Sequence, residues 1–427
     1  MKKILFLACV CLLTACCFEA EKNTDEEPPY EAKIAWDSGL YSNDYQSHIV
    51  EDGAVYFYER PPGYHTVNVY ALTKLDADTG KLLWRSREIF NNIIFCQPIV
   101  NDGIVYVFLE PNTIWCFDTG TGEKTATVKV DVDGKNLNIE KNPTVYKQYL
   151  YLSLWGASQY FTRLDINSIS HNISTEAVQY PEVEILWEPE TKGFVTAKPV
   201  VHDNIIYTAT YTATYGAGYD PVELAGFNVE TKETVFHVSF GGPEDGELLW
   251  PEKGSQLNPI LIHEGVIYYL SWSIRAWKLK TGEPLFSHVF DYPLPEPQWY
   301  GAAASLQATY YKGKIFYTSG ECYTTPDSFR NVHCIDAKTG KQVWSHITKN
   351  SYSLETNPII AHGRLFVSHY WGLWVYEPET GKIIGVDKSF YGEGQGRNIL
   401  YKDYMICLRE DRENNEICRL VAVYVGK

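Results

Sequence analysis

The sequence predicts an all-β protein built from repeats of one four-stranded module, and three observations support this prediction. A turn motif of the form Asp-x-x-Thr-Gly returns along almost the whole chain. A short hairpin precedes most copies of the motif. The runs between the turns alternate apolar and polar residues with a period of two, which is typical of strands. Aromatic residues make up 15% of the 427 residues, and such rings suit strands that pack against neighbouring sheets.

The clearest copy of the turn motif is Leu75–Trp84, which reads Leu-Asp-Ala-Asp-Thr-Gly-Lys-Leu-Leu-Trp. Asp76 can accept hydrogen bonds from the backbone of its own turn, and Gly80 can take the positive φ of a tight turn. The strand that follows carries a bulky ring, Trp84, which needs a neighbouring module to bury it. A helix is disfavoured because the motif breaks helices. The other copies begin at Phe117, Phe227, Trp277, Ile335 and Tyr376.

The hairpins upstream of the motif include Pro98–Tyr106 and Pro358–Phe366. A hairpin together with the two strands around the motif gives four strands, the usual number in a β-propeller blade. The motif resembles the PQQ-like β-propeller repeat family, whose tryptophan-docking motif reads much like residues 75–84 and 335–344. The resemblance covers roughly residues 34–425. It implies the fold and leaves the activity open.

The repeat predicts an eight-bladed β-propeller. The final block, 397–425, supplies only three strands, and the lone strand Lys33–Gly39, with Trp36 at the ring position, can complete it. Closure by strands from both ends of the chain removes a free sheet edge. Seven blades are the alternative, if the block at 142–190, whose turn reads Asp165–Ser168, is not a full blade. The other blades are expected at about 47–88, 96–130, 143–187, 198–240, 258–290, 306–347 and 357–388.

Residues 1–15 are predicted to be a lipoprotein signal peptide. Lys2 and Lys3 form the positively charged end, and Ile4–Leu13 form an apolar stretch that is too short to span a bilayer. Such a segment directs a chain to the export pathway of a bacterium.

The stretch Leu13–Cys16 resembles a bacterial lipobox, which implies that Cys16 is acylated, for example with palmitate, and is the first residue of the mature protein. Ordinary secretion is the alternative. Acyl chains would anchor the protein to a membrane, and we expect the outer membrane. Residues 16–32 are acidic and contain proline, and they are predicted to be a tether to the propeller domain at 33–427.

The chain is acidic, with a formal net charge of −16. A body of this charge repels nucleic acid and anionic lipid surfaces. The composition therefore argues against a protein that binds DNA or RNA.

The connections between strands are unevenly distributed over the two faces of the predicted ring. If the strands of each blade are named a to d from axis to rim, the a–b and c–d turns are short and share one face. The b–c and d–a connections hold nearly all the extra length and share the other face, and variable loops on a rigid scaffold often carry function. We call it the long-loop face and expect it to bind a protein partner, or alternatively to stack rings on a glycan. Its candidate residues are Tyr211, Tyr215, Tyr219, Trp299, Tyr300, Tyr370 and Trp371.

A polar residue opens every a strand, so these residues are expected around the axis at the channel mouth. They could form a ring of hydrogen-bonding groups for a ligand. The alternative is that they cap strand ends and bind channel water. The residues are Ser47, Gln97, Asn142, Lys198, Asn258, Gln307, Asn357 and Arg397.

No catalytic, cofactor or metal set is expected. PQQ-dependent dehydrogenases share the repeat, and this resemblance would imply an adjacent cysteine pair beside the quinone and carboxylates for Ca²⁺. The adjacent pair here, Cys16–Cys17, lies at the lipobox, and none of the eight mouth residues is Asp or Glu. A quinone-dependent dehydrogenase is therefore the least favoured alternative. Lipobox, tether and repeats together resemble the lipoproteins of outer-membrane β-barrel assembly, which implies a non-enzymatic scaffold that binds a protein partner.

The cysteines of the propeller are expected to be mostly free and buried. Cys96 and Cys116 would lie two strand spacings apart, about 9–10 Å, which is too far for a disulfide. The remaining two hairpin pairs are offset in register. They are Cys322 with Cys334, and Cys407 with Cys418.

Overall fold

The computed structural model describes twenty segments of the chain. They are residues 28–42, 48–62, 69–93, 96–135, 137–139, 143–156, 159–171, 177–188, 193–195, 198–212, 222–240, 260–270, 273–289, 303–304, 308–320, 330–348, 356–369, 372–390, 397–410 and 418–426.

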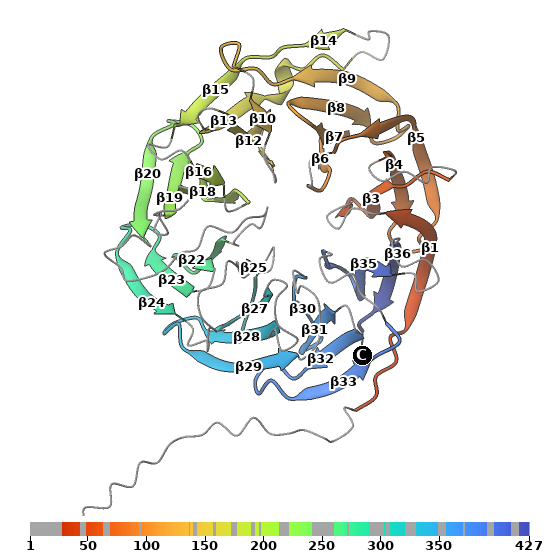
Figure 1. Ribbon diagram of the computed structural model, residues 1–427, viewed down its shortest axis with the longest axis vertical. Coiled ribbons are helices and arrows are strands. Elements are labelled where there is room, and N and C mark those ends of the chain that lie inside the picture. The colour runs from red at the N-terminus through yellow and green to blue at the C-terminus, as the bar shows by residue number, and fades with distance from the viewer. Residues whose placement is uncertain are drawn as a thin grey trace, which may run out of the picture.

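The strands form eight sheets that follow one another around a ring (Figure 1). Within each sheet the four main strands run antiparallel, with strand a nearest the axis and strand d at the rim. The eight-bladed β-propeller predicted from the sequence is therefore confirmed. The block around Asp165 is a full blade, which removes the seven-bladed alternative.

The first four blades follow the chain in order. Blade 1 consists of β2 (His48–Glu51), β3 (Ala54–Glu59), β4 (Val69–Asp76) and β5 (Leu82–Asn91). Blade 2 consists of β6 (Ile99–Asn101), β7 (Ile104–Leu109), β8 (Thr113–Asp118) and β9 (Lys124–Lys129). Blade 3 consists of β11 (Thr144–Tyr146), β12 (Tyr149–Trp155), β13 (Gln159–Asp165) and β15 (Val183–Trp187). Blade 4 consists of β17 (Val200–His202), β18 (Ile205–Thr212), β19 (Val222–Asn228) and β20 (Thr234–Phe240).

The other four blades complete the ring. Blade 5 consists of β21 (Ile260–His263), β22 (Val266–Leu270), β23 (Ser273–Lys278) and β24 (Pro284–Val289). Blade 6 consists of β26 (Thr309–Tyr311), β27 (Lys314–Gly320), β28 (Arg330–Asp336) and β29 (Gln342–Thr348). Blade 7 consists of β30 (Ile359–Ala361), β31 (Arg364–His369), β32 (Gly372–Tyr376) and β33 (Ile383–Asp387). Blade 8 consists of β34 (Ile399–Tyr401), β35 (Tyr404–Glu410), β36 (Cys418–Tyr424) and β1 (Ile34–Ser42).

Short additional strands extend three inner edges. β10 (Asn138–Ile139), β16 (Gly193–Val195) and β25 (Ala303–Ala304) pair with the b strands of blades 3, 4 and 6.

The two ends of the chain close the ring, as predicted. β1 pairs antiparallel with β36, and Trp36 lies opposite Ala422. In Figure 1, β1 runs along the outer side of β36 and so supplies the d strand of blade 8. The sheet of blade 8 therefore contains strands from both ends of the chain.

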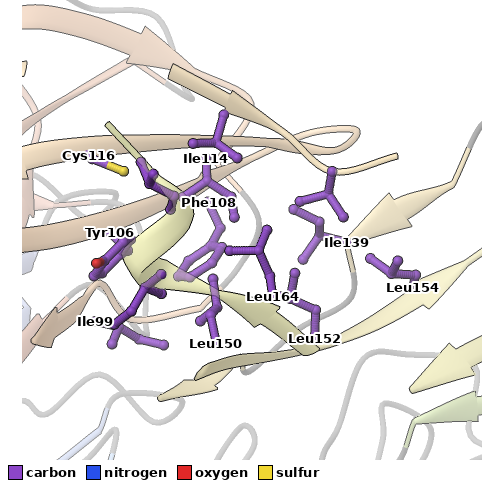
Figure 2. Packing of buried hydrophobic residues seen from close by; sticks show 14 of the residues in the cluster. Ile99, Tyr106, Phe108, Ile114, Cys116, Ile139, Leu150, Leu152, Leu154 and Leu164 are labelled. Atoms are coloured by element: carbon purple, nitrogen blue, oxygen red, sulfur yellow. The ribbon is translucent and has the colours of Figure 1, made fainter. Parts of the chain in front are cut away.

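The hydrophobic core lies between blades. Figure 2 shows Tyr106 and Phe108 of blade 2 in one cluster with Leu150 and Leu152 of blade 3. The b strands are buried on both faces because each is covered by two neighbouring blades, and all six residues of β3 are buried. The period-two alternation predicted from the sequence therefore describes the outer strands better, as in the exposed–buried pattern of β20.

The turn motif has the predicted hydrogen bonds. Asp76 Oδ1 accepts from the Thr79 backbone N–H at 2.9 Å and from Thr79 Oγ1 at 2.7 Å, and Gly80 has a φ of +67°. In blade 3 the Thr-Gly pair is missing, and the turn is a 3₁₀ segment, Ile166–Ser168. There Asp165 Oδ1 accepts from the Asn167 N–H at 2.9 Å. The acidic residue therefore preserves the turn where the rest of the motif is lost.

The residue directly after the Asp position of the motif donates a backbone hydrogen bond to the a–b turn of its own blade. In blade 1, the Ala77 N–H donates to Gly53 O at 3.0 Å. Blade 7 carries Pro378 at this position, which has no N–H to donate. The equivalent bonds elsewhere in the described residues are Thr119 to Gly103, Ile166 to Gln148, Val229 to Asn204, Leu279 to Gly265, Ala337 to Gly313 and Val425 to Asp403.

The carbonyl of that same residue accepts a hydrogen bond from the preceding blade. Two of these donors are not tryptophan: the Arg163 guanidinium donates to Val229 O at 2.5 Å, and the Tyr268 hydroxyl donates to Ala337 O at 3.0 Å. One residue per turn thus ties two blades together. The tryptophan donors are Trp36 to Ala77, Trp84 to Thr119 and Trp344 to Pro378, at 3.1, 2.9 and 2.9 Å.

The end of the predicted tether packs on the propeller. The Tyr30 N–H donates to Val386 O at 3.0 Å, and the Val386 N–H donates to Pro28 O at 2.9 Å. The Ala32 N–H donates to Asp387 Oδ2 at 2.6 Å. Residues 28–32 therefore lie along β33 of blade 7 before the chain enters blade 8 as β1.

A second segment crosses between blades 2 and 3. β14 (Val178–Gln179), which follows the c strand of blade 3, pairs in parallel with β9 of blade 2. His171, which lies shortly before β14 in the chain, also approaches blade 2, since its Nδ1 is 3.0 Å from Thr125 Oγ1 on β9. Figure 1 shows β14 outside β9 at the rim.

Candidate functional site

The two faces of the ring are built differently. The a–b and c–d turns are joined to each other by the backbone hydrogen bonds described above, such as Ala77 to Gly53. Because the strands are antiparallel, the start of each a strand lies at the opposite end, on the long-loop face. Tyr211 is placed at that end, since it pairs with Val222 at the b–c end of β18. Six other candidate residues lie outside the described residues: Tyr215, Tyr219, Trp299, Tyr300, Tyr370 and Trp371.

Four of the eight residues predicted at the channel mouth fall in the described part of the chain. Gln97, Lys198, Asn357 and Arg397 each stand two residues before an a strand, namely β6, β17, β30 and β34. Neighbouring a strands contact one another around the ring, so these positions surround the axis. The remaining four lie outside the described residues: Ser47, Asn142, Asn258 and Gln307.

Asn357 connects two blades at the axis. The Asn398 side-chain N–H donates to Asn357 O at 3.0 Å, and the Asn357 side chain donates to Asn398 O at 3.5 Å. Ser368 Oγ donates to Asn398 Oδ1 at 3.0 Å. These bonds tie blade 7 to blade 8 at the axis. The sequence analysis missed Asn398, although it directly follows a predicted position.

The other described axial residues are positively charged or amide groups. Burial lowers the pKa of Lys198 to about 7, and the nearby Arg397 charge lowers it further in the same direction. Burial lowers the pKa of Arg397 to about 10. His48, at the start of blade 1, has its pKa lowered to about 4 by burial and then by Arg397, against a backbone hydrogen bond to Ile406.

Several axial polar atoms lack hydrogen-bond partners. Within the described residues, Arg397 Nε, His48 Nδ1 and Gln97 Oε1 are buried without a partner. Buried polar groups are normally satisfied, so each of these atoms calls for a ligand or water.

The four mouth residues that the structure describes include no carboxylate. Ca²⁺ binds carboxylate and carbonyl oxygens, whereas Lys198 and Arg397 are basic residues. In the part of the chain that the structure describes, no group of three or more His, Cys, Asp or Glu side chains could hold a metal ion.

Five cysteines are described, and all are buried: Cys96, Cys116, Cys334, Cys407 and Cys418. Cys407 lies opposite Val421, while Cys418 lies opposite Glu410, which confirms the predicted register offset of this pair. Burial raises the pKa of the Cys407 thiol to about 12, so it is not poised as a thiolate nucleophile. Cys322 lies outside the described residues.

Buried histidines make the fold sensitive to acid. His333 in β28 is fully buried and stacks on Tyr317 with ring centroids 4.7 Å apart, and burial lowers its pKa to about 3. The unfolded chain takes up this proton at about pH 6.5 and the native state does not, so stability falls as the pH falls from 6.5. On going from pH 7 to pH 5, the free energy of unfolding should fall less in His333→Phe than in the parent protein. The difference between the two proteins should be up to ~1.4 kcal/mol per pH unit. Urea titrations at both pH values measure this, and equal losses in both proteins would contradict it.

Comparison with known proteins agrees with the repeat. Residues 44–164 match the family model PQQ_2, described as outer membrane protein assembly factor BamB. The quinoprotein alcohol dehydrogenase PedH of Pseudomonas putida is 26% identical over 201 residues, which are 44% of this chain and 30% of that protein. The chain thus matches less than a third of the length of this curated relative.

Solved structures match over nearly the whole ring. BamB from Moraxella catarrhalis has a TM-score of 0.58 at 11% identity, covering 92% of this chain and 100% of that one. Quinohemoprotein alcohol dehydrogenase from Comamonas testosteroni has a TM-score of 0.62 at 13% identity, covering 92% and 76%. The computationally designed Ika8 protein has a TM-score of 0.57 at 12% identity, covering 92% and 99%. At these identities the matches show the fold alone.

Among the described residues, no helix has the length and apolar character needed to cross a membrane.

Proposed function

We propose, from the PQQ-like β-propeller repeats that this chain carries, that it is a non-enzymatic scaffold, anchored by lipid to the outer membrane, that binds a protein partner through its long-loop face. The acyl chains on Cys16 would hold it at the membrane surface. The similarity of residues 44–164 to an outer-membrane assembly factor supports a role in the assembly of outer-membrane proteins.

The observation that carries this proposal is the difference between the two faces. On the turn face, backbone hydrogen bonds join the a–b and c–d turns in blades 1 to 6 among the described residues, and Val425 makes the equivalent bond to the a–b turn of blade 8. Such short turns offer little surface that can vary. Recognition therefore falls to the opposite face, where the connections 213–221, 241–259 and 290–302 are long and the first and last of them carry several aromatic residues.

The described mouth residues favour a scaffold over a quinone enzyme, because none of the four is a carboxylate that could bind Ca²⁺. The scaffold needs no calcium centre.

Photo-crosslinking in intact cells tests the partner-binding face. A photoreactive phenylalanine analogue placed at Tyr215, Tyr300 or Trp371 should give a discrete crosslinked protein. The same analogue at Lys280 or Lys338, exposed positions on the c–d turns of blades 5 and 6, should give none. Mass spectrometry of the crosslinked band identifies the partner.

Two outcomes would contradict the proposal. Crosslinks of equal yield from both faces would show that the long-loop face has no special role. A glycan array that captures the protein while no crosslinked protein forms would favour the glycan-binding alternative. In the same cells, Cys16→Ser should release the protein from the membrane fraction, and retention would contradict the lipid anchor.

A further inference from the structure

We propose that the axial end of the propeller binds a small polyanion that carries carboxylate or phosphate oxygens, held between Lys198 and Arg397. This site is separate from the aromatic loops assigned to a protein partner. It concerns residues that stand two positions before the a strands of blades 4 and 8.

The first step is the excess of positive charge at the axis. Lys198 and Arg397 make no ion pair with any described carboxylate, whereas five other lysines of the described residues do. Those lysines are Lys147, Lys232, Lys278, Lys314 and Lys402. In a chain of net charge −16, carboxylates are abundant, so two cations at the axis without a described carboxylate partner are not explained by composition. A buried charge without a counter-charge is costly, and a bound anion removes that cost.

The second step is the placement of the two cations. Lys198 precedes β17 of blade 4 and Arg397 precedes β34 of blade 8, half a ring apart. The positive charge of Arg397 nevertheless acts on both Lys198 and His48 of blade 1. Because blades 4 and 8 lie half a ring apart, the charge of Arg397 can act on Lys198 only across the axis. Cys96, which precedes blade 2, also acts on Lys198 and is fully buried.

The third step is a donor without a partner. Arg397 Nε is buried and makes no hydrogen bond within the described residues. The guanidinium can bind a planar carboxylate or a phosphate through two parallel hydrogen bonds, and the ammonium of Lys198 supplies a point charge. This set matches an anion with at least two charged oxygens on separate groups or on one phosphate.

Isothermal titration calorimetry on the full chain in detergent tests the site. Citrate and inorganic phosphate serve as separate probes, and sodium chloride at matched ionic strength controls for salt. At least one probe should bind, and Lys198→Met or Arg397→Met should weaken its binding about tenfold or more, since a hydrogen bond to a charged group is worth about 1.5–3 kcal/mol. Lys278→Met is the control of equal charge change, because Lys278 pairs with Glu283 on a c–d turn.

Thermal unfolding supplies a second readout that separates binding from structure. Without anion, Lys198→Met and Arg397→Met should unfold at the same temperature as the parent or higher, because each removes an uncompensated charge. With anion, only the parent and Lys278→Met should gain stability. The proposal is overturned if neither probe binds, if all variants bind equally, or if the axial variants are less stable without anion. Binding of citrate but not phosphate would identify a carboxylate ligand, and the reverse a phosphate.

Discussion

Gly122→Ala is expected to lower the free energy of unfolding by about 2–4 kcal/mol, through two separate effects. Gly122 has a φ of +75°, a conformation that costs an alanine about 1 kcal/mol. A Cβ at this position would also lie 2.5 Å from Cε3 of Trp84, the ring of the preceding blade. Trp84 cannot move away freely, because its indole N–H donates to Thr119 O at 2.9 Å. Overpacking of this kind costs about 1–3 kcal/mol. Urea denaturation followed by tryptophan fluorescence measures the sum.

Gly265→Ala is the matched control. Gly265 has a φ of +76°, but a Cβ there would meet nothing within 4 Å. It should therefore cost only the backbone term, about 1 kcal/mol. Equal losses in the two variants would show that ring docking contributes nothing to stability. Gly381→Ala, which would place its Cβ 2.5 Å from the Trp344 ring, should behave like Gly122→Ala.

The turn motif made the fold predictable. Most copies specify an acidic residue and a glycine, and in several blades the ring that follows the motif packs on the turn glycine of the next blade. The motif near Asp76 therefore encodes both the hairpin turn and the inter-blade docking. Blade number and ring closure followed from counting copies and from the unpaired strand around Trp36.

Contacts between segments far apart in sequence were not predictable in the same way. Arg163 and Tyr268 replace tryptophan as the inter-blade donors, and nothing in their local sequence marks them for this role. The stretch 28–32 was predicted to be part of a tether because it contains proline and follows an acidic segment. Its hydrogen bonds to β33 use backbone groups, which carry no sequence signal.

The candidate site was predicted in position but not in chemistry. The repeat placed Gln97, Lys198 and Arg397 at equivalent positions around the axis, and the structure agrees for these residues. Their charge was overlooked because all eight positions were treated as one polar set. The available signal was the presence of two cations among the mostly neutral residues at the eight mouth positions, in a chain that is acidic overall. Electrostatic effects between opposite blades, such as that of Arg397 on Lys198, required the closed ring.

Arg85→Met is expected to lower the free energy of unfolding by about 2–4 kcal/mol, because it strands a buried carboxylate. Glu59 is 1% exposed, and its two oxygens accept from Arg85 at 2.5 and 2.7 Å and from Thr73 Oγ1 at 2.7 Å. Arg85 itself is 32% exposed, so water can solvate the guanidinium but cannot reach the carboxylate. The asymmetry predicts that Glu59→Gln costs less, about 1 kcal/mol, since the amide carries no charge and can still accept from Thr73.

Arg419→Met separates this effect from the loss of an arginine in general. Arg419 is also 32% exposed, but its partner Asp37, at 3.2 Å, is 29% exposed and can be hydrated when the arginine is removed. Its loss should therefore cost about 0–1 kcal/mol, the usual value of a surface ion pair. Urea midpoints of the three variants give the comparison. Similar losses in Arg85→Met and Arg419→Met would mean that burial of the acidic partner does not set the cost, because burial is the main difference between the two pairs.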